Sequence, residues 1–270
     1  MTNHTITNPA GPDHIGAGHT GAGPTNAGHD DAGPADAGHD SAGAAPTRVV
    51  PDLPADPRRI FAAALERAVA VVRGIRAEQL GGVTPCDELD VCGLIVHLVE
   101  VTQRIAALGD GRDPMALPGA PVGLDLAGLR AEVERGAAAA IAAFAPADRL
   151  DAMRSLPWVT MPGRAHLASY TNELTVHAWD LAVATGQAVV WDDEVVALAD
   201  RAIRAAFPPV RSTVFAALSV DQPELFAAGH PWRDAVDPGD AGAPIDRLVA
   251  YNGRDPRWQP APAGRGVSAG

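Results

Sequence analysis

Apolar residues recur at three- and four-residue intervals in four long segments of the chain, a spacing that places them on one face of an α-helix. The first segment begins at Asp56 and Pro57, residue types common at helix starts, and ends before the glycine pair at 81–82. Glycine or proline bounds the other segments as well. The pattern predicts four long helices, over residues 57–80, 90–108, 125–144 and 163–185. Four such helices favour a helix bundle and a mainly α fold.

The rest of the chain is less regular. Residues 192–207 and 245–251 have the pattern of two further helices, whereas residues 212–242 alternate turn formers with short apolar runs and could form strands or loops. Residues 1–48 are rich in Gly, Ala, Asp and His, and the triplet Ala-Gly-His returns every ten residues. We expect this leader to be disordered, with weak metal collection by its histidines as the alternative. Residues 259–270 are expected to form a frayed tail.

The amino-acid composition excludes several functional classes. All 21 basic side chains are arginines, so the lysines required by P-loop NTPases, Schiff-base enzymes and kinases are missing. A net charge of −12 argues against a nucleic-acid partner. The longest apolar run, residues 137–145, is shorter than the roughly 18 residues of a membrane span, and no charged signal region precedes Arg48. With only two cysteines, we expect a cytoplasmic protein, monomeric or weakly dimeric, without a membrane partner.

Histidine and carboxylate side chains on the predicted second and fourth helices are the main candidates for chemistry. Glu173 and His177 are four residues apart and face the same space, and His97 lies among apolar residues of the second helix. Two imidazoles and one carboxylate would make a three-ligand zinc site with an open fourth position. The alternatives are a hydrogen-bonded core histidine and an ordinary helix pair. Cys86 and Cys92 are weaker candidates, because small buried thiols are common without a metal.

Several stretches of the chain resemble the mycothiol-dependent maleylpyruvate isomerase family, which belongs to the wider DinB-like metal-binding bundles. The stretches are Thr84-Pro85-Cys86, Asp90-Val91, residues 94–98, residues 173–187, residues 246–249 and residues 253–258. The specific part is E-x3-H-x-W-D-L-A-x-A-T-G at residues 173–186, and the last two stretches resemble an uncharacterised actinobacterial branch. The chain departs from the family pattern at Leu89, which replaces a usual tryptophan, and at Cys92-Gly93, which replaces a charged pair.

The resemblance implies a DinB-like four-helix bundle over residues 55–187, followed by a smaller C-terminal α/β subdomain over residues 188–258. It implies a divalent metal, usually zinc, held by His97, Glu173 and His177. The metal would hold mycothiol, a low-molecular-weight thiol, as the thiolate that attacks a small-molecule substrate in an isomerase or S-transferase reaction. A non-catalytic metal-binding module and a metal-dependent hydrolase remain as alternatives.

Other side chains have supporting roles in this hypothesis. Asp180 could orient a ligand imidazole or be an ordinary helix-terminal carboxylate. Tyr170 and His166 share the ligand stripe of the fourth helix and could line a cavity or simply pack. Arg247 and Arg254 could anchor a substrate carboxylate or form structural ion pairs.

Overall fold

The computed structural model describes residues 52–213, 216, 233–240 and 242–260, and its fold is mainly α, as the pattern predicts. The elements in chain order are α1 (Arg58–Gly74), the 3₁₀ turn η1 (Ala77–Gln79), α2 (Val91–Asp110), α3 (Leu126–Ala143), the 3₁₀ turn η2 (Ala147–Leu150), β1 (Met153–Leu156), β2 (Val159–Pro162), α4 (Gly163–Thr185), α5 (Asp193–Ala206) and α7 (Pro244–Tyr251). The leader at 1–48 and most of the 212–242 segment lie outside the described residues.

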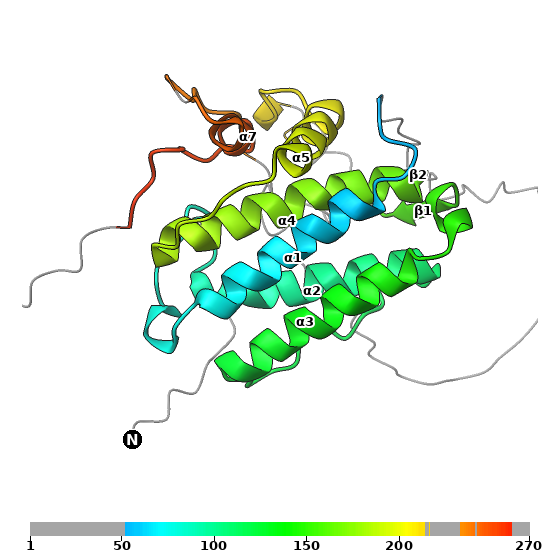
Figure 1. The fold of residues 1–270 in the computed structure, drawn as a ribbon, viewed down its shortest axis with the longest axis horizontal. Helices are drawn as coiled ribbons and strands as arrows, with labels where there is room; N and C mark the ends of the chain where they lie inside the picture. Colours follow the sequence, from blue (N-terminus) through cyan, green and yellow to red (C-terminus); the bar gives the residue numbers. More distant parts are fainter. Residues whose placement is uncertain (1–51, 214–215, 217–232, 241, 261–270) are drawn as a thin grey trace, which may run out of the picture.

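Helices α1 to α4 form the bundle that the four apolar stripes predict. Helix α2 packs on α3 and α1 packs on α4, while α1–α3 and α2–α4 contacts close the bundle. Helix α4 also has neighbours on its other side, where α5 and α7 pack against it (Figure 1). The bundle core is made almost entirely of aliphatic side chains with a few aromatic ones, as the low aromatic content of the sequence requires.

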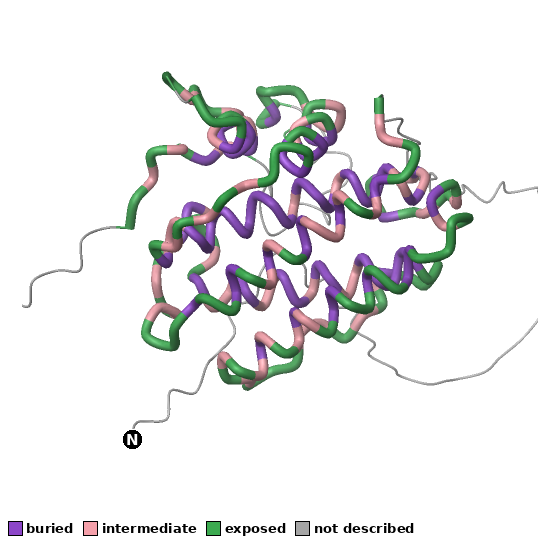
Figure 2. Tube along the Cα trace, viewed as in Figure 1, coloured by how far each residue is buried: buried purple, intermediate pink, exposed green. Residues whose placement is uncertain are grey.

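Helix α4 is buried almost all round because it lies between these two groups of helices (Figure 2). Its buried surface includes polar side chains, which need internal hydrogen-bond partners. Three threonines solve this locally by donating to the carbonyl one turn before them, for example Thr175 to the oxygen of Thr171 at 2.6 Å. The remaining buried polar groups of α4 include His177 and Asp180.

Local capping chemistry fixes most helix ends. Asp90, Asp125 and Asp192 each accept hydrogen bonds from backbone N–H groups in the first turn of α2, α3 and α5. Gly186 ends α4 in the left-handed conformation at φ 69°, as predicted. Helix α2 does not stop at Gly109 but continues to Asp110, and the left-handed residue is Gly111.

Two other expectations for the helices need correction. Helix α1 ends at Gly74 rather than near residue 80, and η1 occupies part of the remainder. The N-cap of α1 is Pro57 rather than Asp56, although the Asp56 carboxylate still accepts from the backbone N–H of Arg58 at 3.1 Å and also pairs with the Arg58 guanidinium. Helix α1 therefore both begins and ends inside the range 57–80 that the pattern predicts.

A two-stranded antiparallel hairpin of β1 and β2 precedes α4 and was not predicted from the pattern. The helices expected over 192–207 and 245–251 are present as α5 and α7. The described part of residues 188–258 contains helices and no strand. Any strand of the expected α/β subdomain would therefore have to come from residues outside the described ranges.

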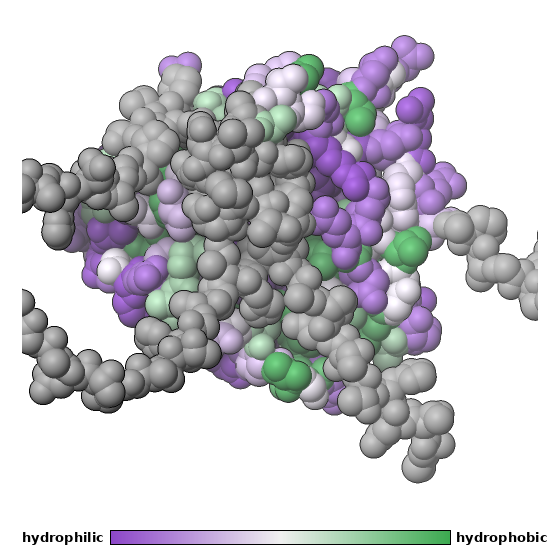
Figure 3. Space-filling view, turned by 180° about the vertical axis from the view of Figure 1, so that it is seen from behind, coloured by the Kyte–Doolittle hydropathy of each residue, from purple (hydrophilic) through white to green (hydrophobic). Residues whose placement is uncertain are grey.

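The described surface is mixed in polarity. Seen from behind, hydrophobic residues form small separate patches among hydrophilic ones (Figure 3). Among the described residues, one helix, α2, is long and apolar enough to span a membrane by composition, but 61% of that window is buried inside the bundle. A buried core helix of a soluble protein meets the same criterion, so α2 is weak evidence for a membrane span.

Candidate metal centre

Two neighbouring helices bring the three predicted ligands together. His97 lies in the middle of α2, and Glu173 and His177 lie one turn apart on α4. The Oε1 atom of Glu173 is 3.0 Å from Nε2 of His97 and 3.3 Å from Nε2 of His177. The two imidazole rings meet edge to face, with their centroids 4.9 Å apart. The site therefore consists of one carboxylate oxygen between two imidazole nitrogens.

Charge and burial perturb this group strongly. Burial alone would lower the pKa of His177, but the carboxylates of Glu173 and Asp180 outweigh it and raise the pKa to about 9. Burial raises the pKa of Glu173, yet the two histidines hold it well below its usual range. His177 thus lies between two carboxylates, with Nε2 beside Glu173 and Nδ1 beside Asp180.

The second ring nitrogen of His177 has a fixed partner. Its Nδ1 lies 3.0 Å from Oδ2 of Asp180, a completely buried carboxylate. Asp180 in turn contacts the guanidinium of Arg254, at 3.2 Å from Nη2 and 3.4 Å from Nε. Burial raises the pKa of Asp180, but Arg254 and His177 bring it below its ordinary value. Asp180 therefore has the position of the carboxylate that orients a metal-bound histidine.

The donor set fits a zinc ion. Zinc bonds of about 2.0–2.1 Å in tetrahedral geometry place neighbouring ligand atoms about 3.3 Å apart, close to both Glu173–histidine separations. All three ligand atoms lie within 4.8 Å of one another. Glu173 and His97 keep 28% and 20% of their side-chain surface exposed, so the group is accessible from solvent.

Cys86 lies nearer to the site than its place in the sequence suggested. Its Sγ, a ring nitrogen of His177 and a carboxylate oxygen of Asp180 also lie within 4.8 Å of one another. The loop that carries it is held by Thr84, whose hydroxyl bonds the backbone of residues 86 and 89. Burial raises the pKa of the Cys86 thiol to about 11, and Asp180 is already engaged by Arg254. Cys86 is therefore a neighbour of the site on its Asp180 side.

The structure does not bring every predicted residue to the centre. Tyr170 is buried on α4 three residues before Glu173. His166 is fully buried and bonds the carbonyl of Arg154 in β1 through Nε2 at 2.9 Å. Arg247 lies exposed on α7 and donates to the carbonyl of Gly242. Arg254 is buried against Asp180, as described above.

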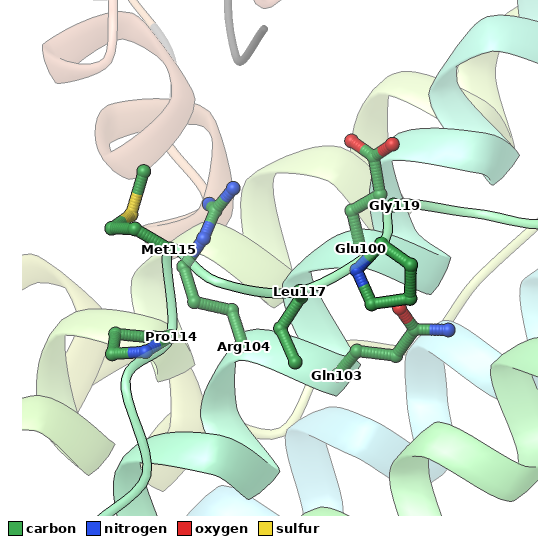
Figure 4. A pocket seen from close by; sticks show the side chains of 8 residues that line it. Glu100, Gln103, Arg104, Pro114, Met115, Leu117 and Gly119 are labelled. Carbon is green, nitrogen blue, oxygen red and sulfur yellow. The ribbon is translucent and has the colours of Figure 1, made fainter. Parts of the chain in front are cut away.

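A small hollow of about 90 Å³ lies on the α2 side of the molecule. Glu100, Gln103 and Arg104 of α2 form one wall, and the loop over residues 114–119 forms the other (Figure 4). Glu100 and Arg104 follow His97 by three and seven residues and so share its side of the helix. The hollow combines charged, amide and apolar groups one to two turns from a candidate ligand.

Comparison with known proteins identifies the family. Residues 61–182 match the family model described as the mycothiol maleylpyruvate isomerase N-terminal domain. Two uncharacterised proteins of Mycobacterium tuberculosis, from strains CDC 1551 / Oshkosh and H37Rv, are each 30% identical over 202 residues. Each alignment covers 75% of this chain and 100% of the relative. The chain belongs to this family. No solved structure matches the sequence.

Membership in the mycothiol maleylpyruvate isomerase N-terminal domain family agrees with the resemblance stated from the sequence motifs. The matched residues contain the three candidate ligands and Asp180. Arg254 lies outside them, in the C-terminal part of the chain. One feature of the sequence could have indicated that Cys86 lies near the site. Cys86 belongs to the Thr84-Pro85-Cys86 motif, which comes shortly before the helix that carries His97.

Proposed function

We propose that the protein binds one zinc ion through His97, Glu173 and His177 and uses it to activate mycothiol for attack on an electrophilic small molecule. The carrying observation is the single carboxylate oxygen of Glu173 between two imidazole nitrogens at separations suited to tetrahedral zinc. Membership in a mycothiol-related family supports a thiol as the second ligand. When bound, the metal supplies positive charge that favours the thiolate, the nucleophilic form of a thiol.

The protein's own residues prepare the centre for an anionic ligand. Asp180 accepts a hydrogen bond from Nδ1–H of His177, which leaves Nε2, the nitrogen beside Glu173, as the one that can bind a metal. Two neutral imidazoles and one carboxylate neutralise only half of a divalent charge, so a thiolate remains attracted. The partial exposure of His97 and Glu173 leaves access for a small molecule, which favours a catalytic centre over a closed structural one.

The chemistry follows from the thiolate. In the isomerase reaction it adds to a cis double bond conjugated to a carbonyl, the resulting single bond rotates, and elimination gives the trans isomer and the free thiol. In an S-transferase reaction the sulfur stays attached to the substrate, and the carbanion formed by the addition takes up a proton instead of expelling the thiolate. We also propose a cytoplasmic location, since a reduced thiol cosubstrate and the free cysteines Cys86 and Cys92 suit a reducing compartment.

Cobalt substitution tests the thiol step. The protein is loaded with Co²⁺ in a Cys86→Ser, Cys92→Ser background, so that any sulfur signal comes from added thiol. Mycothiol should produce an intense sulfur-to-cobalt charge-transfer band in the near ultraviolet and release a proton. The same titration with His177→Ala should give no band.

The outcomes separate the three functions. A sulfur band together with turnover of a cis-unsaturated keto acid supports the isomerase, and a stable thioether product supports the transferase. Metal binding without a sulfur band or proton release at millimolar thiol contradicts the thiol-dependent function. Hydrolysis without added thiol would then favour the hydrolase, and inertness would favour the non-catalytic module.

A further inference from the structure

The end of α7 contacts the ligand-bearing helix α4 at two buried points. The side chains of Asn252 and Asn172 exchange amide hydrogen bonds of 3.0 and 3.2 Å, and Asn172 directly precedes Glu173. Arg254 contacts both carboxylate oxygens of Asp180, three residues after His177. Apolar packing of α7 on the Val176 and Trp179 side of α4 supports both contacts (Figure 1). The C-terminal segment therefore holds α4 on either side of its two ligands.

A turn at Gly253 places the Arg254 side chain against Asp180. The N–H groups of Gly253 and Arg254 bond the carbonyls of Ala250 and Val249, each at 3.0 Å, which is the hydrogen-bond pattern of a Schellman helix end. Gly253 has φ 81°, and a Cβ there would lie 2.6 Å from Cβ of Arg233. Both the conformation and the lack of space require glycine. The Arg254 guanidinium also donates to the carbonyl of Asn252 at 2.8 Å, which fixes its plane.

We propose that Arg254, presented by the Gly253 turn, is a positioning residue that fixes Asp180 and through it the imidazole of His177. Asp180 has no exposed surface, and the buried guanidinium is its cationic partner. Two contacts to one carboxylate set its orientation as well as its place. With Oδ2 held 3.0 Å from Nδ1 of His177, the imidazole keeps Nε2 directed at Glu173. Arg254 thus acts on the metal ligand without touching the metal.

The inference rests on the proposed zinc site and is tested by zinc affinity, measured by competition with a chromophoric chelator at fixed pH. Arg254→Gln should weaken zinc binding about 10–100-fold, the usual effect of losing such an outer partner, and Asp180→Asn should do the same. The double variant should be no weaker than the weaker single variant, because both changes break one chain of contacts. Arg254→Lys, which keeps the charge, should recover part of the loss. Arg257→Gln, which removes a neighbouring exposed ion pair to Asp255, is the control and should leave affinity unchanged.

A second pair of variants tests the turn. Gly253→Ala should weaken zinc binding in the same direction as Arg254→Gln. Gly239→Ala is the matched control, because Gly239 also has positive φ, at 61°, but its added Cβ would meet nothing closer than 4.0 Å. Gly239→Ala should bind zinc as the parent does. Circular dichroism of the metal-free proteins shows whether each variant folds. If Arg254→Gln does not fold, the zinc affinity of Gly253→Ala still tests whether the position of Arg254 affects zinc binding.

The results distinguish this inference from the function it rests on. If the parent protein binds no zinc, the proposed function fails. If the parent binds zinc and both Arg254→Gln and Gly253→Ala bind it equally well, only the positioning role of Arg254 is overturned. A purely structural role is indicated if Arg254→Gln weakens zinc binding as much in the Asp180→Asn background as in the parent.

Discussion

Replacing Gly136 with alanine should destabilise the bundle, although glycine to alanine in a helix usually stabilises it. Gly136 lies in α3 against Thr102 of α2, and an added Cβ would lie 2.8 Å from the Cβ of Thr102 and even closer to its hydroxyl. Thr102 is buried, and its hydroxyl donates to the carbonyl of Val99 at 2.9 Å, so it cannot easily turn away. Overpacking costs about 1–3 kcal/mol, against a helix-propensity gain of about 0.5–1 kcal/mol.

The short contact places the expected cost near the top of its range, for a net loss of about 2 kcal/mol. In a domain of this size such a loss lowers the melting temperature by about 4–8 °C, measurable by circular dichroism. Ala139→Gly, at an exposed position of the same helix, calibrates the propensity term. In a Thr102→Ala background the cost of Gly136→Ala should shrink. If Gly136→Ala instead raises the melting temperature, the close approach of α2 and α3 described here is wrong.

Three further predictions concern buried groups near the core. His166 is buried with its Nδ1 unpartnered, and burial lowers its pKa below 6.5, so its contribution to stability is complete above about pH 6.5 and is lost as pH falls through the lower folded pKa. Denaturant melts between pH 5 and 8 should therefore show a shallower acid loss for His166→Gln than for the parent; equal slopes would refute this. Cys86→Ser should keep the zinc content of the parent, because the Cys86 sulfur groups with His177 and Asp180 and not with His97 and Glu173; loss of zinc would instead make Cys86 a ligand. Chelation of the metal should leave the far-ultraviolet circular dichroism nearly unchanged, since the bundle core is built without the three ligands, whereas unfolding would indicate a structural metal.

Local chemistry explains why so much of the fold was predictable. The N-caps Asp90, Asp125 and Asp192 and the C-cap Gly186 act within a few residues of the helix ends they define. Glu173 and His177 could be paired because four residues make one helical turn. The partnership with His97 could not be inferred from helical spacing, which favours an ordinary core histidine; the prediction that His97 is a metal ligand came from the family resemblance.

The parts that were missed depend on contacts between residues far apart in the sequence. The sequence pattern predicts a helix stop at Gly109, but this residue lies inside α2, where an added Cβ would be 2.7 Å from the Cβ of Ala143. Neither the pairing of Arg254 with Asp180 nor the approach of Cys86 to His177 leaves a periodic signal. The β1–β2 hairpin is two four-residue strands, too short for alternation to distinguish them from a loop.

The metal content of the purified protein tests the central claim most directly. The protein is first dialysed against buffer with added zinc and then exhaustively against metal-free buffer. Elemental analysis should then find about one zinc ion per chain in the parent protein. The control His166→Gln, which changes a histidine of the same helix outside the site, should also keep it. His177→Ala should lose most of the zinc, and the double variant His97→Ala, His177→Ala should lose all of it. Stoichiometric zinc in the folded double variant would contradict the assignment of His97, Glu173 and His177 as the metal centre.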